Sequence, residues 1–147
     1  SNEISRAKRE RRPLSCILID LDSFKQVNDT YGHQAGDQVL RDISALLRRT
    51  VRAYDILIRW GGEEFLVLLP GAHLNAAEEV AQRLRTAAET RLGDIEGLGA
   101  RLTITFGVAT FAAGASLEAC LKAADDALYR GKASGRNRVV SDISQLA

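Results

Sequence analysis

The chain has 147 residues, of which 46% are hydrophobic and 27% carry a charged side chain. This composition is ordinary for a globular protein, and the length suits one domain with one sizeable core. The 20 basic and 19 acidic residues leave a net charge of only +1, so nothing in the overall charge calls for nucleic acid as a partner. No apolar run approaches 18 residues and no signal peptide is visible, so we expect a cytoplasmic domain.

The chain begins abruptly in a charged, helix-like stretch over residues 3–12, after Ser1-Asn2, which resembles an expression remnant. We therefore expect a domain over residues 1–147 whose N-terminal edge is truncated and which belongs to a longer protein. Its two cysteines, Cys16 and Cys120, lie in apolar surroundings. Buried free thiols are favoured over a disulfide there, which is typical of a reducing compartment.

The first third of the chain predicts a strand and two helices. A short, apolar, β-prone run over 14–21 predicts a buried strand. Asp22-Ser23 offers an N-cap for a short helix over 24–29, which Tyr31-Gly32-His33 ends. A longer helix is predicted over 35–52 because its apolar residues form one stripe: Val39, Leu40, Ile43, Leu46, Leu47 and Val51.

A hairpin is predicted next. Two strand-like runs, 54–60 and 63–69, flank Gly61-Gly62, a pair typical of a two-residue turn in which both residues adopt positive φ. Pro70-Gly71 then ends the second strand.

The remainder predicts two helices and two strands. Asn75 is expected to cap a helix that runs to Leu92, and an alternating pattern predicts a strand over 102–108. Ser116 is expected to cap a last helix through Lys132, before a short strand over 138–141. The order β-α-α-β-β-α-β-α-β predicts an α+β sandwich of the ferredoxin-like, palm type, with helices flanking a mostly antiparallel sheet.

Carboxylates fall where two of these strands meet their loops. Asp20 is near the end of the buried first strand, and Glu63-Glu64 follows the glycine pair. A charge at a buried strand end is costly unless it is paired or binds a cation. Mg²⁺ typically takes one or two carboxylates plus phosphate oxygens and water, and glycines let the backbone approach an anionic ligand closely. The pattern therefore indicates metal-dependent phosphoryl or nucleotidyl transfer.

Each of these residues also has a simpler interpretation. Gly-Gly is common in hairpins, and Glu63-Glu64 alone fits a solvated turn. Strand alternation places Asp22 on the same face as Asp20. A helix N-cap is nevertheless favoured over a metal ligand for Asp22.

Three longer segments resemble the GGDEF family of diguanylate cyclases. The run from Arg59 to Phe65, RWGGEEF, resembles the family's signature in its GGEEF form. The run from Asp20 to Asp29, DLDSFKQVND, resembles its D-x-D-x-F-K-x-x-N-D element, which Tyr31-Gly32-His33 and Gly36-Asp37 continue. The run ADDALYRGKASGRN, residues 124–137, resembles its closing element. The likeness covers about residues 9–140 and implies a domain that condenses two GTP into cyclic di-GMP and two pyrophosphates.

The resemblance implies a site for Mg²⁺ or Mn²⁺, with two ions in each active site. Its ligands would be the Asp20 carboxylate, the Leu21 backbone carbonyl and Glu63, and Glu64 would share that role. Glu63 would also help to deprotonate the attacking 3′-hydroxyl, a reasonable role for a carboxylate beside a dication.

The resemblance also implies residues that bind GTP. Asn28 and Asp37 would read the guanine edge, with His33 near the same pocket. Lys132 and Arg136 would reach the triphosphate; as an alternative, they are helix C-terminal cations favoured by the macrodipole. The backbone amides of Phe24 and Lys25, at a helix start, would face the phosphates. The Phe24 ring is expected in the core, and Arg59 is a weaker candidate for the site.

Arg52-Ala53-Tyr54-Asp55 resembles the family's R-x-x-D inhibition site, five residues ahead of the glycine pair. There Arg52 and Asp55 would bind cyclic di-GMP, with Arg83 as a second contact. The alternative is an exposed ion pair, worth at most about 1 kcal/mol.

The chain departs from the family pattern twice. It lacks the usual L-T-x-L-x-N-R segment ahead of the first strand, which bears on the activity of this segment alone. Gly131 replaces an alanine, a change that costs a helix about 1 kcal/mol.

The two-fold product implies a catalytic homodimer. The family further implies an N-terminal sensory or regulatory domain in the full-length protein, which could be membrane-anchored. Two other functions stay open: a catalytically silent receptor for cyclic di-GMP or GTP, and a cyclase that makes a monomeric or ATP-containing product.

Overall fold

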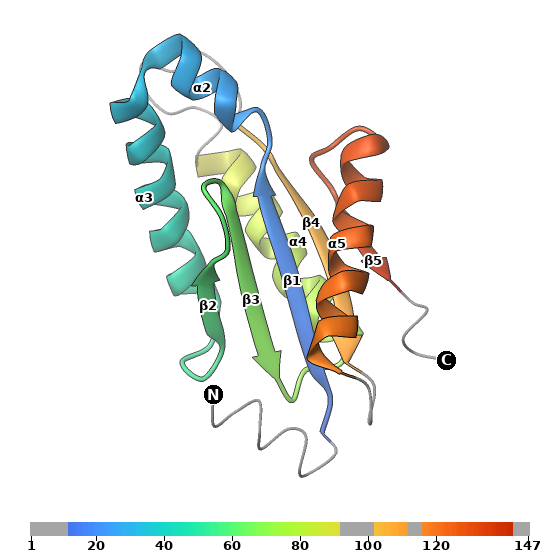
Figure 1. Cartoon of the computed structure of the whole chain (residues 1–147). Helices are drawn as coiled ribbons and strands as arrows, with labels where there is room; N and C mark the ends of the chain where they lie inside the picture. The colour runs from blue at the N-terminus through green and yellow to red at the C-terminus, as the bar shows by residue number, and fades with distance from the viewer. Residues whose placement is uncertain (1–11, 92–101, 112–115, 143–147) are drawn as a thin grey trace.

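The computed structural model describes residues 12–91, 102–111 and 116–142. They form nine elements (Figure 1): β1 (Leu14–Leu21), α2 (Phe24–Tyr31), α3 (His33–Thr50), β2 (Ile56–Arg59), β3 (Glu64–Pro70), α4 (Leu74–Arg91), β4 (Ile104–Phe111), α5 (Leu117–Ala133) and β5 (Val139–Asp142). The order of strands and helices is the predicted one, and the α+β fold is confirmed. Within the described residues no helix combines the length and apolar character needed to cross a membrane.

The sheet has the strand order β2-β3-β1-β4-β5, with β1 at its centre. β1 is antiparallel to both β3 and β4, β2 is antiparallel to β3, and only β4 and β5 are parallel. Every residue of β1 is buried, which explains why its sequence is a continuous apolar run rather than an alternating one. The predicted mostly antiparallel sheet is therefore present.

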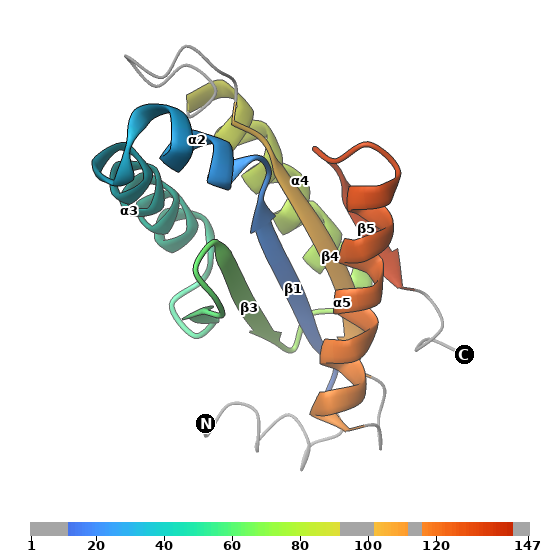
Figure 2. The ribbon, with the colours of Figure 1, turned by 45° about the horizontal axis from the view of Figure 1, so that its top comes forward.

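Helices cover the sheet on two faces, as Figures 1 and 2 show. Ile17 and Ile19 point into the larger core cluster, which they share with α2, α3 and α4. Cys16 and Leu18, one residue out of phase, point into the smaller cluster under α5. The functional residues of α3 and α5 are thus held on opposite sides of one central strand.

Gly107 allows α5 to lie close against β4. A Cβ at this position would overlap the backbone carbonyl of Ala124 and lie 2.6 Å from the backbone nitrogen of Leu128. The same contact region contains Cys16 and Cys120, which are free, buried thiols as expected, with 2.9 Å between their sulfur atoms. α5 is therefore packed closely enough to bring its C-terminal end to the end of β1.

Two local predictions about helix starts are wrong. The residue that caps α2 is Ser23, which has φ 60° and makes no capping bond with its side chain, while Asp22 is engaged elsewhere. α4 begins at Leu74, so Asn75 lies within its first turn instead of capping it. Ser116 does cap α5, accepting a hydrogen bond from the Ala119 amide at 3.0 Å.

The hairpin turn also differs from the prediction. β2 ends at Arg59 and β3 starts at Glu64, so four residues separate the strands instead of two. The amides of Trp60 and Gly61 both donate to the Glu64 carbonyl, and neither Gly61 nor Gly62 has positive φ. Backbone conformation does not require glycine here, and a Cβ on Gly62 would meet no atom within 4 Å.

Candidate functional site

Asp20 lies near the end of β1, between Glu64 on β3 and Thr105 on β4. Its side chain is almost fully buried, and Oδ2 forms an ion pair with Nζ of Lys132 from α5. Oδ1 is buried and has no hydrogen-bond partner among the described residues. A buried carboxylate oxygen without a donor is costly, so Oδ1 still has the capacity to accept a cation or a hydrogen-bond donor.

Glu63 and Glu64 bring two more carboxyl groups to the same end of the sheet. The Leu21 amide donates to the Glu63 carbonyl at 3.3 Å, which ties the turn to the end of β1. Burial raises the pKa of both glutamates, and the negative charge of Asp20 raises each further. The positive charge of Lys132 lowers the pKa of both glutamates and so offsets part of this increase. Asp20 is therefore near enough to influence both glutamates electrostatically, with one lysine offsetting part of the negative charge.

A groove of about 640 Å³ adjoins this cluster. The groove is lined by residues of α2 and α3, several of them predicted to bind substrate, and by residues of the hairpin. The lining residues are Phe24, Lys25, Asn28, His33, Asp37, Leu40, Arg59, Gly62, Glu63 and Glu64. Figure 1 shows why they meet: the end of β1, the β2–β3 turn and the start of α2 lie at the same end of the sheet. Phe24 is also part of the core, as expected.

Gly36 explains how Asn28 is placed in this groove. A Cβ on Gly36 would overlap the Asn28 amide oxygen and lie 2.9 Å from its Cγ. The side chain of Asn28 on α2 therefore packs directly against the backbone of α3. Any larger residue at position 36 would displace the amide that the sequence predicts to read a base.

Arg59 has a larger role in the groove than expected. Its Nε donates to the Gly61 carbonyl at 3.3 Å and its guanidinium donates to the Gly62 carbonyl at 2.7 Å. These bonds hold the turn that carries Glu63. Arg59 is only a weak candidate for the site from the sequence, because an arginine at a strand end has no distinctive spacing to other site residues.

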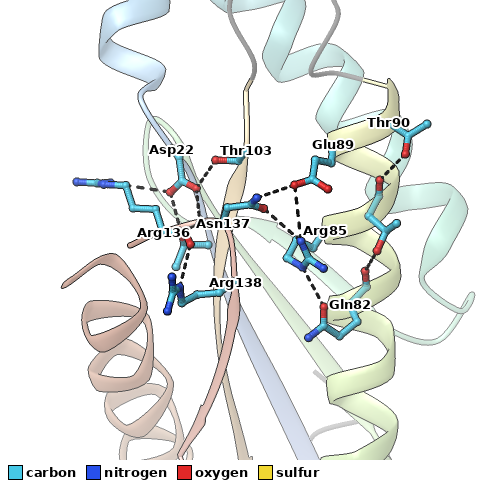
Figure 3. A network of polar contacts seen from close by, with 11 residues as sticks. Asp22, Gln82, Arg85, Glu89, Thr90, Thr103, Arg136, Asn137 and Arg138 are labelled. Atoms are coloured by element: carbon cyan, nitrogen blue, oxygen red, sulfur yellow. Dashed lines mark hydrogen bonds and ion pairs between the residues drawn. The ribbon is translucent and has the colours of Figure 1, made fainter. Parts of the chain in front are cut away.

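Lys132 and Arg136 do not line the groove; both contact the aspartates beside it. Arg136 Nη1 lies 3.9 Å from Oδ1 of Asp22. Asp22 itself is buried and accepts hydrogen bonds from the Thr103 hydroxyl, the Thr105 hydroxyl and the Asn137 amide (Figure 3). The N-cap role expected for Asp22 is therefore wrong, because its oxygens are bonded to β4 and to the segment after α5.

Arg52 and Asp55 form a close pair in a second pocket of about 530 Å³. The Arg52 guanidinium contacts the Asp55 carboxylate at 2.8 Å and lies 4.4 Å above the Tyr54 ring. The Asp55 side chain is fully buried and also accepts from the Arg52 amide at 2.8 Å, while the Arg52 side chain is 43% exposed. Hydrogen bonding to Asp55 raises the pKa of Arg52. The pair is thus more than an exposed ion pair.

Arg83 is not part of that pocket. It lines a different depression along α4, together with Asn75, Glu78, Glu79 and Gln82. Arg48, Ser44 and Arg59 are the other polar residues around Arg52 and Asp55.

The donor set at the end of β1 fits a hard divalent cation whose shell is completed by a ligand. Within the described residues no three His, Cys, Asp or Glu side chains are grouped closely enough to hold a metal by themselves. Mg²⁺, however, usually takes one or two carboxylates and completes its shell with phosphate and water. The unpartnered Asp20 oxygen and the raised pKa values of Glu63 and Glu64 fit that arrangement.

Comparison with known proteins places this arrangement in a family. The chain is 41% identical over 138 residues to diguanylate cyclase DosC of Escherichia coli strain K12, covering 93% of this chain and 30% of that protein. It is 44% identical over 146 residues to response regulator PleD of Caulobacter vibrioides, covering 93% of this chain and 31% of that protein. The chain therefore spans about a third of the length of these curated relatives.

Solved structures agree with this relationship. The active GGEEF domain of a Vibrio cholerae diguanylate cyclase superposes with a TM-score of 0.89 at 33% identity, covering 96% of this chain and 90% of that one. The GGDEF domain of DgcB from Caulobacter crescentus, in complex with c-di-GMP, gives 0.88 at 32% identity, covering 97% and 85%. The family model described as diguanylate cyclase, GGDEF domain, matches residues 1–138. The chain therefore belongs to the diguanylate cyclase GGDEF domain family.

Proposed function

We propose that this chain is the catalytic domain of a diguanylate cyclase, which condenses two GTP molecules into cyclic di-GMP and releases two pyrophosphates. The observation that carries the proposal is the junction of the groove with the buried, incompletely paired carboxylate of Asp20. The groove accommodates a planar base and sugar, and the carboxylates and cations at its end suit a triphosphate. The turn sequence G-G-E-E-F is the same form as that named for the active Vibrio cholerae domain.

Recognition of guanine is assigned to the groove walls. Asn28 can offer both an acceptor and a donor, and the Asp37 carboxylate can accept from the N1 and N2 hydrogens of guanine. Adenine has no such pair of adjacent donors, so GTP should be preferred over ATP. His33, at the first residue of α3, lies in the same wall.

The phosphates are assigned to the end of the groove beside β1. Lys132 and Arg136 bring two cations from the end of α5, and Lys25 lies at the start of α2. The carboxylates of Asp20 and Glu63, the Leu21 carbonyl and Glu64 would hold Mg²⁺ or Mn²⁺, two ions per site. When bound, the metal supplies Lewis-acid stabilisation of charge on the phosphate oxygens.

The chain's own residues then orient the two reacting groups. The 3′-oxygen of one nucleotide forms a bond with the α-phosphorus of the other, the bond to the pyrophosphate oxygen breaks, and pyrophosphate leaves. Glu63, whose pKa is raised by burial and by Asp20, accepts the hydroxyl proton. Because one site holds one nucleotide, two copies of the domain must face each other for both bonds to form.

Feedback by the product is assigned to the Arg52 pocket. The buried Asp55 carboxylate holds the Arg52 guanidinium in place, and Arg48 and Arg59 add positive charge around the same space. A dianionic dinucleotide suits such a pocket. The DgcB structure described in complex with c-di-GMP shows that a related domain binds this product.

The test is product formation from GTP and Mg²⁺ at high protein concentration, resolved by anion-exchange chromatography. We expect cyclic di-GMP from the chain fused to a dimeric coiled coil, at least a hundredfold less from Glu63→Gln, and little change from the exposed control Glu118→Gln. ATP in place of GTP should give no cyclic product. If the forced dimer binds cyclic di-GMP yet makes neither cyclic nor linear product, the chain is a receptor and the catalytic proposal is wrong.

A further inference from the structure

We propose that Asp22 and Asn137 form a positioning pair, which fixes the loop carrying Arg136 so that its guanidinium faces the triphosphate. The inference rests on the proposed function, because its ligand is GTP. In this proposal Asp22 binds the loop after α5 and does not coordinate a metal, although it lies only two residues from Asp20 in the family's D-x-D element.

The Asp22 carboxylate is already saturated by donors from the protein. Oδ2 accepts from the Thr103 hydroxyl at 2.7 Å and from the Asn137 amide at 3.0 Å, and Oδ1 accepts from the Thr105 hydroxyl at 2.7 Å. The carboxylate is buried, and Arg136 lies 3.9 Å from Oδ1. A carboxylate used in this way has little capacity left for a metal, in contrast to Asp20.

The loop that Asp22 holds has an unfavourable backbone. Gly135, Arg136 and Asn137 have φ values of 127°, 63° and 46° in succession. A left-handed conformation is unfavourable for a residue with a side chain, so two such residues in a row need external support. That support comes from Asp22 at the Asn137 amide and from the bond between the Arg136 amide and the Gly131 carbonyl, 2.9 Å.

The Asn137 side chain fastens the other side of the loop to α4, as Figure 3 shows. Its Nδ2 donates to Oε2 of Glu89 at 2.6 Å, and its Oδ1 lies 3.4 Å from Nη1 of Arg85. Arg85 and Glu89 are themselves 3.8 Å apart. Asparagine suits this position because it tolerates left-handed backbone and presents both a donor and an acceptor.

The result is a loop held at Asn137 from two sides, by Asp22 and by α4, with Arg136 immediately before the anchored residue. The side chain of Arg136 is 53% exposed and on the side of the aspartates, whereas the backbone on both sides of it is bonded. An arginine whose backbone is already fixed loses less conformational entropy when it engages phosphate. Asp22 and Asn137 therefore act on the ligand through Arg136.

The direction of the affinity change when the Asp22 charge is removed distinguishes positioning of Arg136 from direct repulsion between Asp22 and the phosphates. Asp22 carries a negative charge close to the expected phosphate position, so its removal should strengthen triphosphate binding if charge alone mattered. If Asp22 positions Arg136, the same removal should weaken binding. Asp22→Asn keeps the shape of the side chain but loses one acceptor, so it isolates this difference.

The experiment measures affinity for a non-hydrolysable GTP analogue by calorimetry and for guanosine by NMR titration. We expect Asp22→Asn to bind the analogue about tenfold more weakly, both with Mg²⁺ and with EDTA. A tenfold loss corresponds to one charge-assisted contact between Arg136 and the phosphates. Guanosine affinity should be unchanged, because guanosine has no phosphate for Arg136 to contact. Asp126→Asn, which removes an exposed charge on α5, is the matched control and should behave as wild type.

Variants of Asn137 and Arg136 test the route through Arg136. Asn137→Gly keeps the backbone amide and tolerates positive φ, but it loses the side-chain bonds to α4. Asn137→Ala loses the same bonds and is also strained at positive φ. The glycine variant should therefore lower the affinity for the GTP analogue by less than the alanine variant does. In an Arg136→Ala background, Asp22→Asn should have no further effect on analogue affinity. The two Asn137 variants give a readout even if Asp22→Asn folds poorly, which thermal unfolding would reveal.

Other outcomes overturn the inference. If Asp22→Asn lowers the affinity for the analogue only in the presence of Mg²⁺, Asp22 is a metal ligand. If it lowers the affinity for guanosine equally, Asp22 stabilises the domain as a whole and does not position Arg136. Analogue affinity equal to or tighter than wild type contradicts positioning. Failure of the wild-type chain to bind the analogue would overturn the proposed function and this inference with it, whereas wild-type binding with an unaffected variant overturns the positioning role alone.

Discussion

Asp20 and Asp22 stand two residues apart at the end of the same strand, yet the fold treats them in opposite ways. Asp22 is surrounded by donors from β4 and from the loop after α5. Asp20 pairs with Lys132 through one oxygen and has a second, buried oxygen without a hydrogen-bond partner among the described residues. The two carboxylates therefore differ in what they can still accept, which supports the proposal of an anchor at Asp22 and a ligand position at Asp20. Donor accounting therefore separates two carboxylates that residue type and spacing do not.

The largest expected effect comes from removing the anchor. Asp22→Ala leaves the Thr103 and Thr105 hydroxyls without their acceptor and leaves the Asn137 amide only its weaker bond to the Thr105 hydroxyl, so the free energy of unfolding should fall by about 3 kcal/mol. Urea denaturation followed by circular dichroism measures this. A loss below about 1 kcal/mol would show that these donors find other partners and that Asp22 is no anchor.

Asp20→Asn should have a much smaller effect on the metal-free protein. The substitution weakens the pair with Lys132 but also removes the repulsion from Glu63 and Glu64, so unfolding free energy should stay within about 1 kcal/mol of wild type. The thermal stabilisation that a GTP analogue with Mg²⁺ gives to wild type should disappear in this variant. A destabilisation as large as that of Asp22→Ala would contradict the distinction between the two aspartates.

The pH dependence of stability tests the charge cluster around Asp20. Glu63 and Glu64 have raised pKa values in the folded protein, first because of burial and second because of Asp20. The folded state therefore holds protons that the unfolded state releases, so these two groups favour folding more as the pH falls from neutral toward the ordinary value of 4.5. Below 4.5 both states are protonated and the gain ends.

The double variant Glu63→Gln/Glu64→Gln isolates this contribution. Without metal it should be more stable than wild type at neutral pH, and the difference should shrink as the pH falls toward 4.5, measured by urea denaturation at each pH. A difference that grows on acidification would have the wrong sign.

The smallest expected effect on stability belongs to Gly62→Ala. A Cβ at this position meets no atom within 4 Å and the backbone has no positive φ, so unfolding free energy should change by less than about 0.5 kcal/mol. Binding of the GTP analogue should nevertheless weaken by about tenfold or more, since the methyl group projects where Gly62 lines the groove. Unchanged affinity would mean that the ligand does not approach this part of the turn.

Much of the fold was predictable because it rests on local periodicity. The continuous apolar run of β1 and the apolar stripe of α3 identify a buried strand and an amphipathic helix without any tertiary information. The groove residues Asn28, Asp37 and Glu63 were expected together through the family resemblance, and the structure brings them together.

The errors share an origin in specific hydrogen bonds that hydrophobic periodicity does not reveal. Asp22 was expected to cap the next helix because its local sequence allows it, but its partners Thr103 and Asn137 are 81 and 115 residues away in the chain. Gly61-Gly62 was expected in a two-residue turn, but Arg59 and the Glu64 carbonyl organise a four-residue loop. Neither the distant donors around Asp22 nor the local bonds of the turn leave a periodic signal in the sequence.

The central position of β1 also has a consequence for how the chain folds. β1 is made first, but its two neighbours are β3, about 50 residues later, and β4, about 90 residues later. Until β4 emerges, one edge of the most apolar strand has no partner, so a partly synthesised chain presents an aggregation-prone edge. Lys132 and Asn137 arrive later still. During synthesis, therefore, neither aspartate can complete its contacts until almost the whole domain has been made.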